Sequence, residues 1–333
     1  MMHKSLPKLD LNVTNRCNFR CVHCAFDSGI EQMSELSLDE LRDLLDETKE
    51  LGGERIDVTG GEATVREDVD KIIRTGKYLG YRIELVTNGS LLTRNRLMRY
   101  RDMGLDSIAV SVDGSDYDRY RMIRGVDEET YRRVIQTIED AVDLGINTKV
   151  NTAVFESNME DLPAIAEQCV EMGVSENGIY YFTPVGRGHR TGQLSVEPLR
   201  WLGFLRERLQ KYGDRIKYSV EIPLIEEGFP DRETGCILKQ DPYHLQVLPD
   251  GNVYPCAILA SYHLPIGNLH EKSVREIWED DGNWERYRSL IDEGVFERYD
   301  GFCADFSGFN EEGYPGYRFV CPLRKFSVGD LSE

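Results

Sequence analysis

Apolar and polar residues follow two different periods along the first two thirds of the chain. Short apolar stretches predict strands at Lys8–Val13, Arg55–Thr59, Arg82–Thr87, Ser107–Val112, Asn147–Val154 and Gly178–Thr183. Helical spacing predicts helices from Leu38, near Asp68–Leu79, near Arg94–Met103, at Glu128–Leu144 and at Met159–Met172. Strands that alternate with helices indicate βαβ units and parallel pairing. Six units are too few for a closed eightfold barrel, so we expect an α/β fold with an open, partial (β/α)6 TIM-like barrel.

The helix from Leu38 has recognisable signals at both ends. Ser37 followed three residues later by Glu40 forms a capping box, in which the two side chains bind each other's backbone N–H groups. Leucines continue at helical spacing, and the pair Gly52-Gly53 ends the pattern. These signals support the helix predicted from Leu38 and, with it, the predicted alternation of helices and strands.

The pattern changes beyond Ser219, where the chain becomes rich in Gly, Pro and Tyr and holds four of its eight cysteines. We expect a barrel domain over residues 1–217 and a small cysteine-rich domain over residues 218–333. In the second domain, His244–Leu248 and Asn252–Tyr254 flank an Asp-Gly pair. Two apolar arms around Asp-Gly predict a β-hairpin.

The charge of the chain excludes some partners. With 40 basic and 59 acidic residues the net charge is −19, which argues against a nucleic-acid surface or a patch for anionic membranes. The sequence has neither an apolar run of secretory length at its start nor a stretch long enough to span a membrane. We therefore expect a cytoplasmic protein, whose grouped cysteines bind metal or act in catalysis instead of forming disulfides.

Three cysteines, Cys17, Cys21 and Cys24, follow the first predicted strand with the spacing C-x3-C-x2-C. A loop in this position lies at the C-terminal mouth of a parallel barrel, where catalytic groups collect. A structural zinc site takes four ligands, and His23 is poorly placed to be the fourth because it lies inside the short x2 gap. A four-iron cluster held by three thiolates keeps one iron open for a substrate, which accounts for the odd number.

This spacing resembles the CxxxCxxC motif of the radical S-adenosylmethionine (SAM) enzymes. The resemblance implies that Cys17, Cys21 and Cys24 bind a [4Fe-4S] cluster whose open iron is chelated by SAM. It also implies that His23, which precedes the third cysteine, packs near the adenine. A structural metal knuckle and a chance grouping are the alternatives.

Further segments of the barrel resemble the same family, each at the end of a predicted strand. Gly60, Gly61 and Glu62 resemble its GGE segment, which binds the SAM amino group, although Ala63 replaces the usual proline. Either a tight bend or a simple turn would explain each segment taken alone. In order along the chain, the resemblance implies SAM contacts from Asn88, Ser111, Asp113, Arg124 as a carboxylate partner, Asn151 and Val185 within Thr183–Gly188.

The distal cysteines have a pattern of their own. Cys236, Gly251 and Cys256 give C-x14-G-x4-C, and Cys303 and Cys321 follow. The pattern resembles the SPASM/twitch extension of radical SAM enzymes, and four cysteines instead of seven imply one auxiliary [4Fe-4S] cluster. A structural zinc ion remains the alternative on spacing alone.

The resemblance implies that the reduced cluster cleaves SAM to a 5′-deoxyadenosyl radical, which abstracts hydrogen from an unactivated C–H of a small molecule or peptide. An external one-electron reductant such as flavodoxin or ferredoxin would reduce the cluster. With the auxiliary cluster as electron acceptor, we expect net oxidation, either dehydrogenation or a crosslink.

Three alternatives remain open. Redox-neutral epimerisation would need a thiol that returns hydrogen, for which Cys169 is the candidate, although its helical context indicates a core residue. Tailoring of tetrapyrrole side chains is the second alternative. A non-catalytic metal-binding scaffold is the third.

Overall fold

The computed structural model describes residues 5–29, 34–192, 195–226, 244–261, 263–292, 317–319 and 325–326. Among these residues, eleven strands form one sheet in the order β11-β10-β9-β1-β2-β3-β4-β5-β6-β7-β13. The strands from β1 to β7 run parallel in chain order: β1 Lys8–Asn12, β2 Arg55–Thr59, β3 Arg82–Thr87, β4 Ser107–Ser111, β5 Asn147–Val154, β6 Glu176–Tyr181 and β7 Lys217–Glu221. The expected α/β partial barrel is confirmed, and β7 adds a seventh parallel strand to the six expected.

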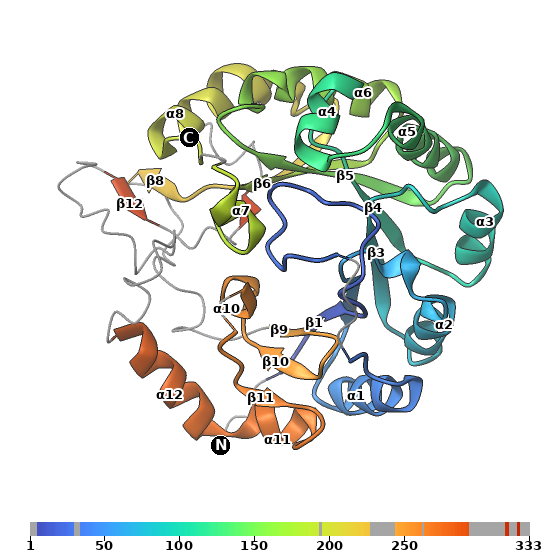
Figure 1. Ribbon diagram of the computed structural model, residues 1–333, viewed down its shortest axis with the longest axis vertical. Coiled ribbons are helices and arrows are strands. Elements are labelled where there is room, and N and C mark those ends of the chain that lie inside the picture. The colour runs from blue at the N-terminus through green and yellow to red at the C-terminus, as the bar shows by residue number, and fades with distance from the viewer. Residues whose placement is uncertain are drawn as a thin grey trace.

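Helices cover the outer side of this curved sheet, and the chain between β1 and the first helix crosses its mouth (Figure 1). The helices between the parallel strands are α1 Leu38–Glu50, α2 Val69–Tyr78, α3 Arg94–Asp102, α4 Tyr117–Arg124, α5 Glu128–Asp143, α6 Leu162–Glu171, α7 Arg187–Arg190 and α8 Pro198–Phe204. Single turns η1 Ala63–Val65, η2 Met159–Asp161, η3 Leu205–Leu209 and η4 Gln210–Tyr212 accompany them. The short helices α4 and α7 were not expected, because each follows a strand end with few apolar residues.

Side-chain caps fix where several helices begin. Ser37 and Glu40 form the expected capping box of α1. Thr93, Asp116 and Asp127 each accept a backbone N–H three residues on, which satisfies donors that a helix N-terminus leaves unpaired.

The expected hairpin is present, and it continues the barrel sheet. Its arms are β9 His244–Val247 and β10 Asn252–Tyr254, and Gly251 adopts φ +80° in the turn. Strand β9 pairs parallel with β1, so that residues far apart in the sequence share one ladder. The remaining elements are α10 Ala257–Ser261, β11 Gly267–Asn268, α11 Val274–Glu279, α12 Asp281–Asp292, a two-stranded sheet of β8 Leu224–Glu226 with β12 Tyr317–Phe319, and β13 Lys325–Phe326 beside β7.

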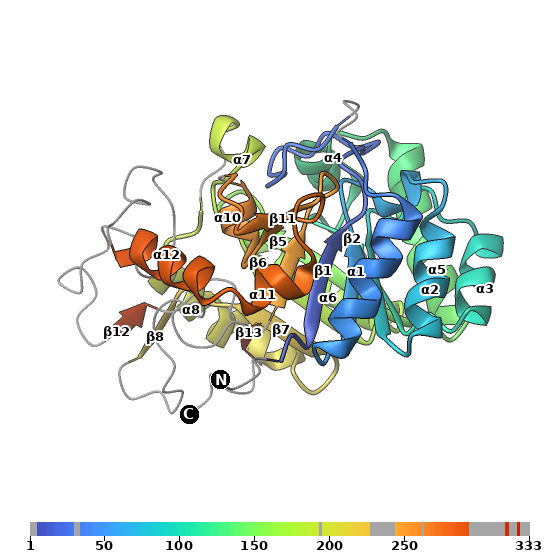
Figure 2. The same cartoon turned by 90° about the horizontal axis from the view of Figure 1, so that it is seen from below.

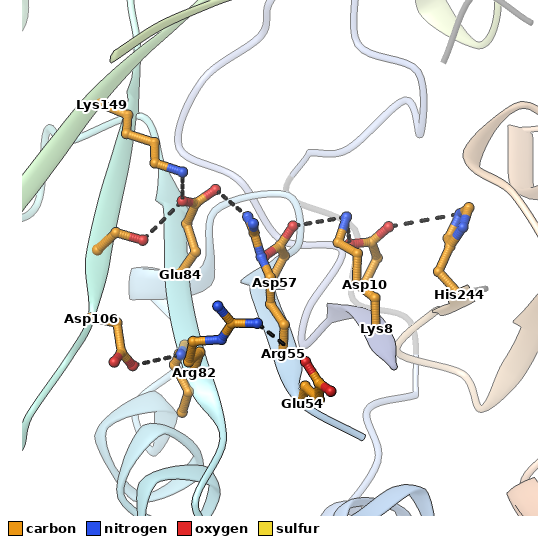
Figure 3. A network of polar contacts seen from close by, with 12 residues as sticks. Lys8, Asp10, Glu54, Arg55, Asp57, Arg82, Glu84, Asp106, Lys149 and His244 are labelled. Carbon is orange, nitrogen blue, oxygen red and sulfur yellow. Dashed lines mark hydrogen bonds and ion pairs between the residues drawn. The ribbon is translucent and has the colours of Figure 1, made fainter. Parts of the chain in front are cut away.

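The inner face of the barrel carries charged residues where a closed barrel usually has aliphatic layers. Arg55 and Asp57 share a strand face with Thr59, which lines the cavity described below, so these charges lie inside the barrel beneath that cavity. Figure 3 shows the resulting chain of contacts, which crosses the sheet from β9 to β5 through the residues His244, Asp10, Lys8, Asp57, Arg55, Glu84 and Lys149.

Distances within this interior network are those of close ion pairs. The Nζ atom of Lys8 lies 2.8 Å from Oδ1 of Asp10 and 3.0 Å from Oδ2 of Asp57. Glu84 accepts from Arg55 at 3.0 Å and lies 2.6 Å from the Nζ atom of Lys149. The buried carboxylates of Asp57 and Glu84 therefore each have two cationic partners, at least one of them from another strand, which offsets the cost of removing the carboxylates from water.

The described residues contain no helix that is both long enough and apolar enough to cross a membrane.

Removal of Glu84 from the interior network should be costly. In Glu84→Ala, the cations of Arg55 and Lys149 lose a buried partner, and we expect a loss of about 3 kcal/mol in the free energy of unfolding. The matched control is Glu54→Ala, which removes an exposed carboxylate beside Arg82 and should cost less than about 1 kcal/mol. Urea unfolding midpoints of both variants measure this, and equal shifts would contradict a special cost for the interior pairs.

Candidate active site

The loop of residues 13–29, hereafter the cysteine loop, follows β1 and carries Cys17, Cys21 and Cys24. Its two ends are held together, because Cys17 N donates to Gly29 O at 2.8 Å and Gly29 N donates to Asn15 O at 3.1 Å. Figure 2 shows the loop at the same end of the barrel as α4 and α7. As expected from the sequence, this is the C-terminal end of the parallel strands.

Each of the three sulfur atoms accepts one N–H donor. Phe19 N lies 3.3 Å from Sγ of Cys17, and Ser28 N lies 3.3 Å from Sγ of Cys24. Arg124 Nη1 lies 3.6 Å from Sγ of Cys21. Burial raises the pKa of Cys17 to about 12 and also raises that of Cys21, so both are thiols until a metal ion takes the proton's place.

A cavity of about 160 Å³ lies below the cysteine loop. Its walls combine the three cysteines with the ends of β2, β3 and β4 and with the segment after β6. The lining residues are Cys17, Phe19, Cys21, His23, Cys24, Thr59, Gly60, Gly61, Val86, Thr87, Asn88, Ser111, Arg124 and Arg187. The structure thus brings together nine of the candidate residues: the three cysteines, His23, Gly60, Gly61, Asn88, Ser111 and Arg124.

Gly60 and Gly61 let the end of β2 approach the backbone of the cysteine loop. A Cβ atom on Gly61 would lie 2.4 Å from Arg16 O, and one on Gly60 would lie 2.6 Å from Thr14 O. Cβ atoms essentially never come that close to another atom, so a side chain at either position would force one of the two backbones to move.

Glu62 is buried and does not line the cavity. Its Oε1 atom accepts from Thr64 N at 3.1 Å and from Thr87 Oγ1 at 2.7 Å, and its Oε2 atom accepts from Asn88 N at 2.6 Å. The carboxylate therefore fixes the end of β3 with donors from this chain. The part of Glu62 in binding the SAM amino group, which the resemblance implies, stays a prediction.

Asn88 connects the end of β3 to the cysteine loop. Its Nδ2 atom donates to Asn18 Oδ1 at 2.9 Å, and Asn18 Nδ2 donates to Ser90 Oγ at 2.8 Å. This bridge aligns the cavity wall at Asn88 with the loop between Cys17 and Cys21.

Asp113 and Arg124 form a buried pair at the end of β4. Arg124 Nε donates to Oδ2 of Asp113, whose Oδ1 accepts from Ala153 N at 2.8 Å. Although burial opposes the charge, Asp113 and Cys21 raise the pKa of Arg124 above its ordinary value. Arg124 lines the cavity with its guanidinium already bound to Asp113 and Cys21, whereas Asp113 lies behind it.

His23 lies edge-on to the ring of Phe155, with ring centroids 5.2 Å apart. Its Nε2 atom is 3.7 Å from Oδ2 of Asp113, and its Nδ1 atom is buried without a hydrogen-bond partner among the described residues. Burial lowers the pKa of His23 to about 4, so the ring is neutral at pH 7. The side chain offers the cavity a neutral, flat wall.

Three other candidates lie outside the cavity wall. Asn151 is half-buried on β5, and Val185 is buried after β6. Cys169 is buried on α6 within the main core, where burial raises its pKa to about 12. The core position agrees with the helical pattern around this cysteine.

Arg187 is a cavity residue that the sequence did not single out. It lies in the Thr183–Gly188 segment named above, and its Nη1 atom donates to Cys21 O at 2.9 Å. An arginine directly after glycine in a strand-end loop was the available signal, but its target is a backbone carbonyl more than 160 residues away in the chain.

Of the four distal cysteines, Cys256 is buried at the start of α10, directly after the hairpin. Cys236, Cys303 and Cys321 lie outside the described residues. In the part of the chain that is described, no three His, Cys, Asp or Glu side chains converge to hold one metal ion. A four-iron cluster does not require such convergence, since each of its cysteines binds a different iron.

Comparison with known families gives two matches. Residues 11–169 match the family described as the Radical SAM superfamily, and residues 236–305 match SPASM, described as an iron-sulfur cluster-binding domain. An "AdoMet-dependent heme synthase" of Methanosarcina barkeri is 28% identical over 314 residues, which cover 87% of this chain and 86% of that protein. An "Fe-coproporphyrin III synthase" of the same organism is 28% identical over 310 residues, covering 82% and 74%.

Solved structures share the fold. SuiB of Streptococcus suis bound to precursor peptide SuiA superposes with a TM-score of 0.73 at 18% identity, covering 86% of this chain and 67% of that one. The structure titled "Native anSMEcpe with bound AdoMet" gives 0.65 at 16%, covering 91% of both chains.

The chain therefore belongs to the radical SAM superfamily and carries a SPASM domain. These domains imply SAM, a [4Fe-4S] cluster and auxiliary iron–sulfur binding. The site fits this cofactor set, because three thiols line one cavity and each sulfur already accepts an N–H bond. The SPASM match, which includes Cys236, Cys256 and Cys303 but not Cys321, favours iron over zinc at those three cysteines.

The close approach at Gly61 gives a direct test of the cavity wall. Gly61→Ala places a methyl group against Arg16 O, and we expect a loss of about 2 kcal/mol in the free energy of unfolding. The control is Gly203→Ala in α8, where a Cβ atom meets nothing within 4 Å, so stability should be unchanged or rise by up to about 1 kcal/mol. A neutral Gly61→Ala would mean that the two backbones are not in contact.

Proposed function

We propose that this radical SAM enzyme oxidises a side chain of a tetrapyrrole. The observation that carries the substrate class is the similarity to a heme synthase along nearly the full length of both chains. A synthase of iron coproporphyrin III has the same 28% identity to this chain, so two relatives are named after a tetrapyrrole. The chemistry itself follows from the family and from the three-cysteine cavity.

In this proposal Cys17, Cys21 and Cys24 bind the [4Fe-4S] cluster, and SAM occupies the cavity beside them. When bound and reduced, for example by flavodoxin or ferredoxin, this cofactor pair supplies a 5′-deoxyadenosyl radical. The segment Gly60–Glu62 accepts the SAM ammonium group through the backbone carbonyls around Gly60 and Gly61. Glu62 supports this segment, because its carboxylate accepts hydrogen bonds from Thr87 and Asn88.

Other residues of the cavity orient SAM and exclude water. His23 supplies a neutral face for the adenine, and Asn88 and Ser111 supply polar groups at the strand ends. Asp113 holds Arg124 beside Cys21. We include Asn151, which pairs with Ser111 in the sheet, and Val185 after β6 as further contacts for SAM. Arg124 is the cation for the SAM carboxylate, which would then share it with Asp113, whereas the guanidinium of Arg187 binds backbone carbonyls of the cysteine loop.

We further propose that Cys236, Cys256, Cys303 and Cys321 bind one auxiliary [4Fe-4S] cluster, within a second domain that begins after β7, slightly later than the boundary expected at residue 217. Buried Cys256 supports this, because the hairpin before it is part of the barrel sheet and ties the second domain to β1. Such a cluster can accept the second electron of an oxidation. The core position of Cys169 argues against a thiol-dependent epimerisation.

The chain should cleave SAM reductively. After anaerobic reconstitution and reduction with dithionite, we expect 5′-deoxyadenosine and methionine by chromatography. Cys17→Ala should abolish both, because three thiolates are needed to hold the cluster. Cys169→Ala is the matched control and should retain cleavage; absence of 5′-deoxyadenosine from the reconstituted wild-type chain would leave only the scaffold hypothesis.

The substrate class is tested by isotope transfer. Iron coproporphyrin III deuterated on its side chains should pass deuterium into 5′-deoxyadenosine and change in mass, whereas unsubstituted amino acids and short peptides should not. Transfer from a peptide but from no tetrapyrrole would overturn the substrate assignment and leave the SAM chemistry intact.

The auxiliary cluster is tested by iron analysis. Two [4Fe-4S] clusters give about eight irons per chain, and Cys256→Ala should lower this to about four. The variant should still cleave SAM without substrate, because the three-cysteine loop is unchanged. About four irons and one zinc in the wild-type chain would disprove the auxiliary cluster.

A further inference from the structure

The segment Gly186–Thr191, which contains α7, lies against the cysteine loop in both views of the fold (Figures 1 and 2). We call it the β6 latch. It donates to four backbone carbonyls of that loop. Arg187 N donates to Cys24 O at 2.9 Å, Arg187 Nη1 to Cys21 O at 2.9 Å, Arg187 Nη2 to Ser28 O at 2.5 Å and Thr191 Oγ1 to Val22 O at 2.8 Å.

Arg187 makes three of these four bonds: one with its backbone N–H and two with its guanidinium. Its third side-chain donor, Nε, lies 2.8 Å from Oδ1 of Asp27, which also binds Arg190. The Arg187 side chain is only 13% exposed. A planar fork with several fixed N–H directions can bind two carbonyls and a carboxylate at once, which a lysine ammonium on a flexible stem does less well.

Gly186 shows that the contact is close at the backbone level. Its φ is +56°, and a Cβ atom there would lie 2.1 Å from Ala25 O. The latch therefore meets the loop backbone next to Cys24, where only glycine is accommodated.

The cysteine loop has no helix or sheet ladder of its own to satisfy its carbonyls. Backbone carbonyls away from water need a partner, and an irregular segment without partners samples many conformations. Three thiols can bind one cluster only if their spacing is maintained. The latch supplies this restraint between Cys21 and Ser28, which includes two of the three cysteines.

We propose that Arg187 is a positioning residue, which holds Cys21 and Cys24 in the arrangement that the cluster requires by binding the carbonyls of Cys21, Cys24 and Ser28. The inference rests on the proposed function, in which these cysteines bind the cluster. Its test therefore includes a measurement on the chain without iron, which does not depend on that function.

The test compares Arg187→Gln with Arg190→Gln in the full-length chain. Both variants remove one positive charge from α7 and one partner of Asp27. Arg190 differs from Arg187 in that its side chain is 63% exposed, and within the described residues it binds the Asp27 carboxylate and no carbonyl of the cysteine loop. The first measurement is the rate at which iodoacetamide alkylates Cys21 and Cys24 in the iron-free chain, followed by peptide mass spectrometry. The second is the rate at which a chelator removes iron after reconstitution.

For Arg187→Gln we expect both rates to rise by on the order of tenfold or more, because the substitution removes the side-chain bonds to Cys21 O and Ser28 O and the loss of one charge-assisted hydrogen bond alone is worth about a factor of ten. The bond from Arg187 N to Cys24 O is retained. The electron paramagnetic resonance spectrum of the reduced cluster should also broaden, because the loop samples several arrangements. Arg190→Gln should match the wild type in all three measurements. Equal alkylation rates in Arg187→Gln and wild type would overturn the proposal.

Thr191→Val is a milder variant, which removes the bond to Val22 O and a longer bond of 3.3 Å to Gly188 O within the latch. It should raise the alkylation rate by a smaller factor in the same direction. If circular dichroism shows that Arg187→Gln does not fold, Thr191→Val becomes the deciding variant. An alkylation rate in Thr191→Val equal to that of the wild type would then count against the latch. If the wild-type chain binds no cluster, the proposed function fails, and the alkylation rates still test the latch.

Discussion

Restraint of the cysteine loop by close backbone approach is the interaction on which the rest of the site depends. This segment lacks regular secondary structure, yet it carries all three thiols of the cavity. The end of β2 approaches it at Gly61, Asn88 binds it from β3, and Gly186 and Arg187 bind it from the segment after β6. Each contact comes from the C-terminal end of a parallel strand, so the barrel geometry itself brings the restraints to one place.

The charged interior of the barrel is a second consequence of this architecture. An open barrel cannot close its interior with layers of aliphatic side chains from eight strands. In this chain Arg55, Asp57 and Glu84 meet across neighbouring strands and form ion pairs below the cavity. Such pairs stabilise little compared with apolar packing, but they strongly disfavour a change in strand register, because any shift would leave buried charges without partners.

The two parts of the chain share one sheet. Since β9 pairs with β1, the hairpin that precedes Cys256 is fixed to the strand that leads into the cysteine loop. Asp10 on β1 and His244 on β9 face each other within the interior network, at 4.0 Å. A continuous sheet would give the proposed auxiliary cluster, of which Cys256 is one ligand, a defined position relative to the cavity.

The first six parallel strands, the long helices between them, the capping of α1, the hairpin and the three-cysteine motif could be predicted from the sequence alone, because each depends on residues close together in the chain. Only the tertiary structure decided which side chains meet. Glu62 accepts hydrogen bonds from Thr87 and Asn88, and Arg187 binds the cysteine loop from the segment after β6. Hydrogen bonds between strand ends depend on how the sheet curves, and local spacing contains no record of that curvature.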